Sequence, residues 1–202
     1  MYIPAYYQLK DFRLIEKLIR EHSFGLLVSG TQATHLPFGI TTSADSLQLS
    51  GHIARNNPHL QSLYGEVLTV FQGPHAYMSP SLYERFNSVP TWNYMAVHCY
   101  GEIELLGEEE NTEIVEQLIL QEEPAYMQHW NQLPDHYRRG LNKGIVSFRI
   151  RVSRIEAAAK LGQDRSANEL QNIYKVLRTS AHTTDHALAD WMELLLPITP
   201  LS

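Results

Sequence analysis

The feature that most constrains the fold is a series of short strand-like segments that are not separated by long helices. Apolar or alternating runs cover residues 24–28, 34–40, 46–55, 67–71, 94–106 and 144–155. Runs of this length and pattern are typical of strands. The chain also lacks GxGxxG and GxxxxGK(S/T), the phosphate-binding signatures of doubly wound folds. We therefore expect a mainly β, α+β fold, in which the strands form a closed or nearly closed barrel with peripheral helices.

The remaining periodic segments predict helices around this sheet. Asp11 is a suitable N-cap for the first of them, and Asn57 with Pro58 opens a short one. The expected helices are residues 12–22, 59–65, 111–122, 168–179 and 185–195. A turn at residues 42–45 would join two strands as a hairpin. There is no linker or repeat, so we expect one barrel domain over residues 1–177 and a helical extension over residues 178–202.

Charge is distributed unevenly along the chain. The net charge is -6, yet residues 102–123 contain nine Glu and no Lys or Arg, whereas residues 138–178 contain ten basic and three acidic residues. We expect the acidic run to be a solvated helix face. The basic run contains no Lys/Arg-rich recognition helix. Its Arg149 and Arg151 lie on a strand and could equally meet the acidic run, so direct DNA binding has little support from the sequence.

Cysteine usage and hydropathy indicate the compartment. Cys99 is the single cysteine, which excludes an intrachain disulfide framework, and its apolar register predicts a buried thiol. No apolar run approaches the roughly 20 residues of a membrane span. The first residues do not resemble a signal peptide. We therefore expect a cytoplasmic protein without membrane contact, and no metal site, because the ten histidines form no HExxH pattern.

The first candidate site is the strand-to-helix junction at Gly51-His-Ile-Ala-Arg-Asn-Asn-Pro58. His52 and Ala54 share one strand face, and Arg55 precedes the helix start at Asn57. Free N–H groups at a helix start and an arginine beside them are suited to phosphate. An ordinary capped helix with a surface arginine explains the same residues.

Further candidates follow the later strands. Gln72 ends a buried strand before a Gly-Pro turn and a loop rich in Tyr, His and Ser, which could bind a ligand or form a rigid structural loop. The triplet Thr91, Trp92 and Asn93 suits a planar heteroaromatic ligand or a dimer interface. Lys160 and Gln163 could hold a carbonyl-rich ring edge, with a solvent-exposed lysine as the alternative. No GxSxG elbow or other pattern identifies a catalytic residue.

Together these motifs are more specific than any one of them. Their order is Tyr2-Ile-Pro, Ala33-Thr-His-Leu-Pro-Phe38, Gly51 to Pro58, Phe71-Gln-Gly-Pro-His-Ala-Tyr-Met-Ser-Pro80, Pro90-Thr-Trp-Asn-Tyr94 and Lys160-Leu-Gly-Gln-Asp-Arg165. Over residues 1–177 the chain resembles the PaiB family of FMN-binding negative transcriptional regulators. The resemblance implies a split-barrel fold and a homodimer with FMN at or near the subunit interface.

The resemblance also implies roles for the candidate residues. Arg55 and Asn57 would hold the FMN phosphate. The ribityl chain or ring would contact His52, Ala54 and Gln72. The ring would pack on Thr91, Trp92 and Asn93, and its pyrimidine edge would meet Lys160 and Gln163. The family usually has Ser where this chain has Gly162 and Asn where it has Asp164, which changes the local hydrogen bonding.

Two functions remain open from the sequence. The family name implies a negative transcriptional regulator, acting directly on DNA or through a protein partner. The alternative is an FMN-dependent oxidoreductase, because FMN itself carries hydride chemistry and the protein only positions a substrate. Candidate substrate-side groups are His35, Tyr77 and His98. Haem binding is a third possibility, since related split barrels include haem-handling proteins.

Overall fold

The computed structural model describes residues 1–43 and 46–199, and the chain divides into two compact units. Unit 1 comprises Met1–Ile15, Gln72–Val97 and Glu156–Ser202, and unit 2 comprises Glu16–Phe71 and His98–Ile155. The helical extension expected from residue 178 belongs to unit 1, and its residues 200–202 lie outside the described residues. The boundary at residue 177 stays a prediction.

One seven-stranded sheet organises the chain, with the strand order β2-β1-β5-β6-β7-β4-β3. The pairings β1–β2, β1–β5, β3–β4 and β4–β7 are antiparallel. The predicted α+β class, built on antiparallel strands, is therefore confirmed. The strands are β1 (Phe24–Ser29), β2 (Gln32–Pro37), β3 (Gly39–Ser43), β4 (Ser46–Ala54), β5 (Glu66–Met78), β6 (Thr91–Leu105) and β7 (Ile145–Lys160).

Several strands differ from the sequence expectation, and β6 begins at Thr91 instead of Tyr94. The single strand expected over residues 34–40 is two strands, β2 and β3, which separate at Phe38. Pro37 has no N–H to continue a ladder, and the buried Phe38 donates its own N–H to the Ser23 carbonyl instead. β5 continues to Met78, where a loop was expected, although its burial pattern loses alternation at Gly73 and Pro74. β7 also continues to Lys160. Residues 44–45 of the predicted hairpin turn lie outside the described residues.

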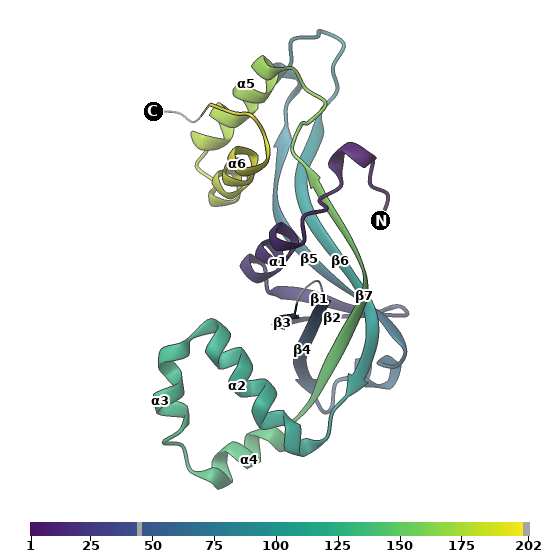
Figure 1. Cartoon of the computed structure of the whole chain (residues 1–202), viewed down its shortest axis with the longest axis vertical. Helices are drawn as coiled ribbons and strands as arrows, with labels where there is room; N and C mark the ends of the chain where they lie inside the picture. The colour runs from purple at the N-terminus through teal and green to yellow at the C-terminus, as the bar shows by residue number, and fades with distance from the viewer. Residues whose placement is uncertain (44–45, 200–202) are drawn as a thin grey trace. The chain divides into compact units, whose positions relative to one another are not determined.

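Most helices match the sequence expectation. They are α1 (Phe12–Glu21), α2 (Asn111–Glu122), α5 (Ala167–Arg178) and α6 (Thr183–Leu195), and the Asp11 carboxylate caps α1 by accepting from the Arg13 N–H at 2.9 Å. The short helix after Asn57 is a 3-10 helix, η2 (Pro58–Ser62). Two helices were not expected, α3 (Met127–Trp130) and α4 (Asp135–Lys143). α2, α3 and α4 follow one another in unit 2, whereas α5 and α6 pack together in unit 1 (Figure 1).

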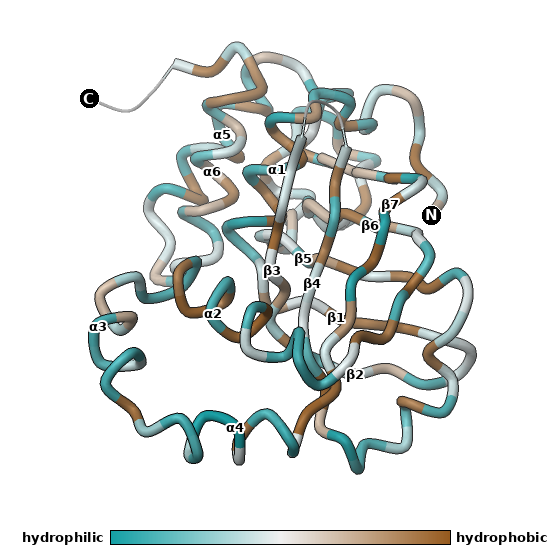
Figure 2. Tube along the Cα trace, turned by 60° about the horizontal axis from the view of Figure 1, so that its bottom comes forward, coloured by the Kyte–Doolittle hydropathy of each residue, from teal (hydrophilic) through white to brown (hydrophobic). Residues whose placement is uncertain are grey.

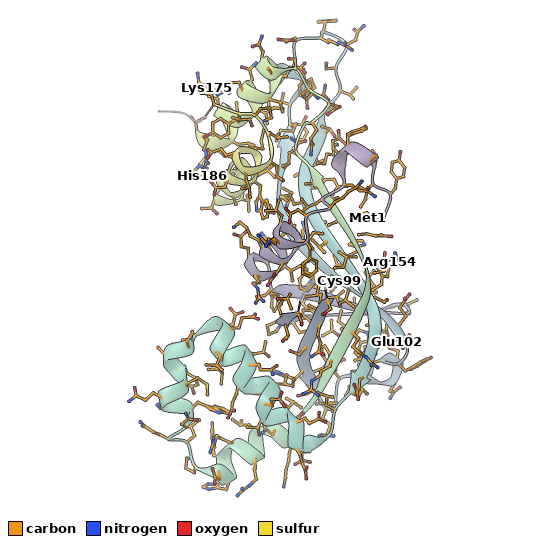
Figure 3. The ribbon with its side chains drawn as sticks, in the orientation of Figure 1. Met1, Cys99, Glu102, Arg154, Lys175 and His186 are labelled. Carbon is orange, nitrogen blue, oxygen red and sulfur yellow. The ribbon has the colours of Figure 1, made fainter. Side chains whose placement is uncertain are left out.

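Each unit has its own apolar core. In unit 2, the Phe38 ring lies 5.4 Å from Phe71 and 6.1 Å from Phe148, centroid to centroid. Cys99 on β6 is buried as predicted (Figure 3), and burial raises its thiol pKa to about 12. In unit 1, α5 and α6 contribute the buried Tyr174 and Trp191. Figure 2 shows apolar residues interspersed along β3 and β4, whereas α4 is mostly hydrophilic. Among the described residues, no helix has the length and apolar character that crossing a membrane requires.

Candidate functional site

Lys160 lies at the centre of a polar cluster in unit 1. Its ammonium donates to the Thr91 hydroxyl at 2.5 Å and lies 5.9 Å from the centroid of the Tyr7 ring. We call Tyr7, Thr91, Asn93 and Lys160 the Lys160 cluster. In the part of the chain that the structure describes, no carboxylate lies within ion-pair distance of this half-buried ammonium. A cation partly withdrawn from water without a counter-charge is suited to an anionic or acceptor-rich ligand.

Asn93 adds a second donor on the same face of β6. It lies two residues beyond Thr91, is 2% exposed, and its Nδ2 is a buried atom without a hydrogen-bond partner among the described residues. Buried amide groups are ordinarily paired, so an unpaired one indicates a missing partner. Lys160 and Asn93 therefore both offer N–H donors, and the ligand that fits them presents acceptors.

The turn after Lys160 is fixed by its own side chains. Gln163 accepts the Leu161 N–H at 2.8 Å through Oε1 and donates to the Ala159 carbonyl through Nε2. Both ends of this amide therefore hold the turn, whereas a ligand contact was predicted for it. Gly162 has φ +93°, a conformation that disfavours Ser at this position. Asp164 accepts a hydrogen bond from the Tyr7 hydroxyl at 2.9 Å.

Two other predicted residues of unit 1 belong to a different surface. Trp92 is 53% exposed and points to the opposite face of β6 from its neighbours Thr91 and Asn93, because successive strand residues alternate. Its ring lies 6.0 Å from those of His75 and Tyr77, both on β5. Gln72 joins this group through a 3.3 Å contact between its Nε2 and the His75 Nδ1. We call these four residues the outer aromatic surface.

The predicted residues of unit 2 begin with His52 on β4. It stands opposite Ser147 of β7 in the sheet, and Ser50 lies on the same face. The His52 Nδ1 and the hydroxyls of Ser50 and Ser147 are buried without partners among the described residues. Burial lowers the pKa of His52, which keeps its imidazole neutral. Three unpaired polar atoms on one face offer hydrogen bonds to a polar ligand or to ordered water. Ala54 ends β4 and is exposed.

Arg55 and Asn57 have structural contacts at the junction that follows. The Arg55 guanidinium donates from Nε to the Lys143 carbonyl at 2.7 Å and from Nη2 to the Ile145 carbonyl at 2.9 Å. It is exposed, and its other N–H groups are left for a ligand. The Asn57 side chain caps η2 by accepting the His59 N–H at 3.0 Å. A 3-10 helix of five residues has a weaker dipole than the helix expected there.

Sequence reasoning missed Tyr7 and Ser147, and it noted Asp164 only as a departure from the family pattern. Tyr7 and Asp164 are separated by 157 positions, and no local pattern brings them together. Ser147 faces His52 only through the β4–β7 register.

The substrate-side candidates are dispersed: His35 stacks on Phe24 at 6.2 Å in unit 2, whereas Tyr77 belongs to the outer aromatic surface. His98 lies 6.4 Å from Tyr100, also in unit 2.

Comparison with known proteins gives one family and several related structures. A family model described as "Putative FMN-binding domain" matches residues 1–154. The protein named "Protease synthase and sporulation protein PAI 2" of Bacillus subtilis is 38% identical over 205 aligned residues, which cover 96% of this chain and 97% of the relative.

Two solved structures share the fold at low sequence identity. The flavocytochrome Anf3 of Azotobacter vinelandii has a TM-score of 0.60 at 12% identity. The aligned region covers 80% of this chain and 73% of the Anf3 chain. The FAD and heme binding protein of Mycobacterium smegmatis has a TM-score of 0.57 at 11% identity, covering 77% of this chain and 74% of its own. These likenesses confirm the predicted split-barrel fold.

Proposed function

The chain belongs to the FMN-binding family whose model it matches, which confirms its resemblance to the PaiB family, and on this premise we propose that it is an FMN-binding transcriptional regulator that acts indirectly. Its cofactor is FMN. The regulatory role is supported by the Bacillus subtilis relative, which is named for protease synthase and sporulation. The indirect action is supported by the way the basic residues are paired.

The Lys160 cluster is the observation that supports a flavin contact in unit 1. The ring edge of FMN presents carbonyl and nitrogen acceptors, which match the unpaired donors of Lys160 and Asn93. When bound, FMN supplies hydride and electron transfer. Lys160 would stabilise negative charge at that edge, and Thr91 would orient the ammonium. Gln163 would act by holding the turn. Gln72 and Trp92 belong to the outer aromatic surface, on the other face of β6 from Asn93, so they would pack on the flavin ring that the partner subunit binds.

In unit 2 a separate group of residues supports contacts to the phosphate and ribityl parts of an FMN molecule. Arg55 and Asn57 would hold the phosphate, and His52 and Ala54 would face the ribityl chain. The unpaired Ser50 and Ser147 hydroxyls beside His52 fit a ligand rich in hydroxyl groups.

Arg55→Ala tests the phosphate contact. We expect FMN affinity, measured by quenching of FMN fluorescence, to fall by about tenfold or more, because hydrogen bonds to a charged group contribute about 1.5–3 kcal/mol. Arg151→Ala is the matched control, since Arg151 is also an exposed arginine of unit 2. Affinity equal to that of the unchanged chain would remove Arg55 from the phosphate site.

Ion pairs inside the chain neutralise several members of the basic run. Arg149 donates to Glu110 at 2.8 Å and to Glu113 at 3.3 Å, so one of the two strand arginines meets the acidic run. Arg138 pairs with Asp135, and Arg178 pairs with Asp190. Because DNA affinity depends on basic side chains that are available to phosphates, this pairing favours regulation through a protein partner or metabolite.

A gel-shift series on the DNA upstream of the gene tests indirect action. We expect the purified FMN-loaded protein to give no specific shift at any salt concentration, while deletion of the gene raises expression of its target genes. A specific shift that weakens with salt would establish direct DNA binding and refute this part of the proposal.

A homodimer is the proposed assembly. The exposed Trp92 and Tyr77 of the outer aromatic surface are residue types that are enriched in protein interfaces. Sedimentation equilibrium should give twice the mass of one chain. Trp92→Asp should shift the equilibrium to monomers, whereas Phe24→Asp, at an exposed aromatic residue of unit 2, should not.

An FMN-dependent oxidoreductase is the second candidate. It is supported by the absence of a counter-charge beside Lys160 within the described residues, since an unneutralised cation would favour reduced, anionic flavin. Loss of the flavin absorbance on addition of NADH or NADPH, and its return with a small-molecule acceptor, would favour this function over the regulator.

A further inference from the structure

The N-terminal segment lies beside the end of β7 in unit 1. Leu9 donates its N–H to the Ala157 carbonyl at 2.9 Å, and Gln8 pairs with Ala158 in an antiparallel bridge. The 3-10 turn η1 (Ala5–Tyr7) immediately precedes these contacts. Backbone pairing therefore places Tyr7 next to the last residues of β7, among which is Lys160.

Two contacts hold the Tyr7 side chain in place. The ring is 9% exposed, and its hydroxyl donates to the Asp164 carboxylate at 2.9 Å. Burial and this hydrogen bond both raise the pKa of the phenol, so the hydroxyl stays protonated and remains a donor. Asp164 follows Gly162 and Gln163, and the Gln163 side chain hydrogen-bonds to the backbone of this turn, which places the acceptor.

The Tyr7 ring in turn faces the Lys160 ammonium. The centroid lies 5.9 Å from Nζ, within the range of a cation–π contact, and Thr91 holds the same ammonium with a hydrogen bond. A lysine has a flexible four-carbon stem and many rotamers. The Tyr7 ring and the Thr91 hydroxyl both contact the Lys160 ammonium and so restrict the rotamers of this side chain. Less conformational entropy is then lost when a ligand binds to the ammonium.

We propose that Tyr7, anchored by Asp164, is a positioning residue that orients Lys160 toward the acceptor edge of the flavin. This inference rests on the proposed flavin contact of Lys160. It adds the N-terminal segment to the cofactor site and gives Asp164 a role that depends on its acceptor oxygen. Tyr7 acts through Lys160, so its effect on FMN requires the lysine.

A double-mutant cycle with Tyr7→Leu and Lys160→Met tests this dependence. The readouts are FMN affinity and the reduction potential of bound FMN. We expect Tyr7→Leu to weaken binding roughly five- to tenfold and to lower the potential, as loss of an oriented cation would do. In the Lys160→Met background, Tyr7→Leu should change neither quantity. Equal effects of Tyr7→Leu in both backgrounds would overturn the positioning role.

Conservative variants separate positioning from folding. Tyr7→Phe keeps the ring and Asp164→Ala removes only the anchor, so each should give a smaller loss of affinity in the same direction. Tyr2→Leu, at an exposed tyrosine of the same segment, should bind FMN like the unchanged chain. If Lys160→Met binds FMN with unchanged affinity and potential, the flavin contact of Lys160 and the role of Tyr7 both fail. If Lys160→Met is weakened but the two effects are additive, only the role of Tyr7 fails.

Discussion

Gly162 illustrates how one backbone conformation shapes the turn beside the Lys160 cluster. Its φ is +93°, and a Cβ there would lie 3.3 Å from the Leu170 Cδ2. We expect Gly162→Ala to lower the free energy of unfolding by about 1–3 kcal/mol, measured by chemical denaturation.

Gly140 in α4 is the matched control for this substitution. A Cβ there meets no atom within 4 Å, and its backbone is helical. Gly140→Ala should raise the free energy of unfolding by about 0.5–1 kcal/mol, because alanine is the better helix former. Equal effects at the two glycines would contradict the strained-turn interpretation.

Buried histidines make stability depend on pH. His59 is buried, its Nδ1 contacts the Thr34 hydroxyl at 2.7 Å, and burial lowers its pKa from the ordinary value of 6.5. The unfolded chain therefore takes up a proton at a higher pH than the folded chain. The stability that the neutral His59 imidazole contributes is fully present above about pH 6.5. It is lost as the pH falls toward the lower pKa that His59 has in the folded chain.

His59→Gln tests this pH dependence. The difference in melting temperature between pH 7.5 and pH 5.5 should shrink in His59→Gln and remain in His136→Gln, where the histidine is exposed. An unchanged difference in His59→Gln would show that other groups cause the acid sensitivity.

Single residues were predicted with mixed success, for physical reasons. The burial of Cys99 was predicted correctly because alternating apolar residues along a strand indicate which face is buried. The same alternation separates Trp92 from Thr91 and Asn93, although the sequence motif groups them. Tyr7 and Asp164 meet only in the folded chain. Their contact depends on backbone pairing over long sequence distance, which local patterns do not encode.

At the scale of elements, α2 protects the free edge of the sheet in unit 2. β3 ends the strand order, and the Gln121 side chain accepts the Ile40 N–H at 3.1 Å and donates to the Phe38 carbonyl at 2.9 Å. Arg20 donates to the Ile40 carbonyl at 3.3 Å. An amide side chain thus pairs the edge as a neighbouring strand would.

Gln121→Ala should expose this edge. We expect a loss of about 1–2 kcal/mol in the free energy of unfolding and more light scattering on heating, because two backbone groups lose their partners. Gln117→Ala on the same helix is the control, since the Gln117 side chain hydrogen-bonds to Glu113 on its own helix and not to the β3 edge among the described residues. If both variants behave like the unchanged chain, the edge does not depend on Gln121.

The elements that were missed have weak sequence signals. α4 contains almost no apolar residues, so it lacks the periodicity that identified α1 and α2. β5 passes through Gly73-Pro74, a dipeptide that ordinarily marks a turn. Conversely, α2 was predicted with its bounds intact because Ile114, Val115, Leu118 and Ile119 recur at helical spacing.

At the scale of the whole molecule, the fold followed from combined motifs more than from any single segment. Periodicity predicted strands and excluded a doubly wound sheet, and the order of the motifs predicted the split barrel. The site was predicted less completely. Its candidate residues fall in both compact units, and in unit 1 only Lys160 and Thr91 are in direct contact, with Asn93 on the same face of β6 as Thr91.

A crystal structure of the chain with bound FMN tests the flavin contact of Lys160 most directly. We predict a flavin ring acceptor within hydrogen-bond distance of the Lys160 Nζ, and a partner for the Asn93 Nδ2, which now has none among the described residues. The Tyr7 ring should remain beside the ammonium. Bound FMN with the Lys160 ammonium still hydrogen-bonded only to Thr91, and with the Asn93 Nδ2 still unpaired, would contradict this account.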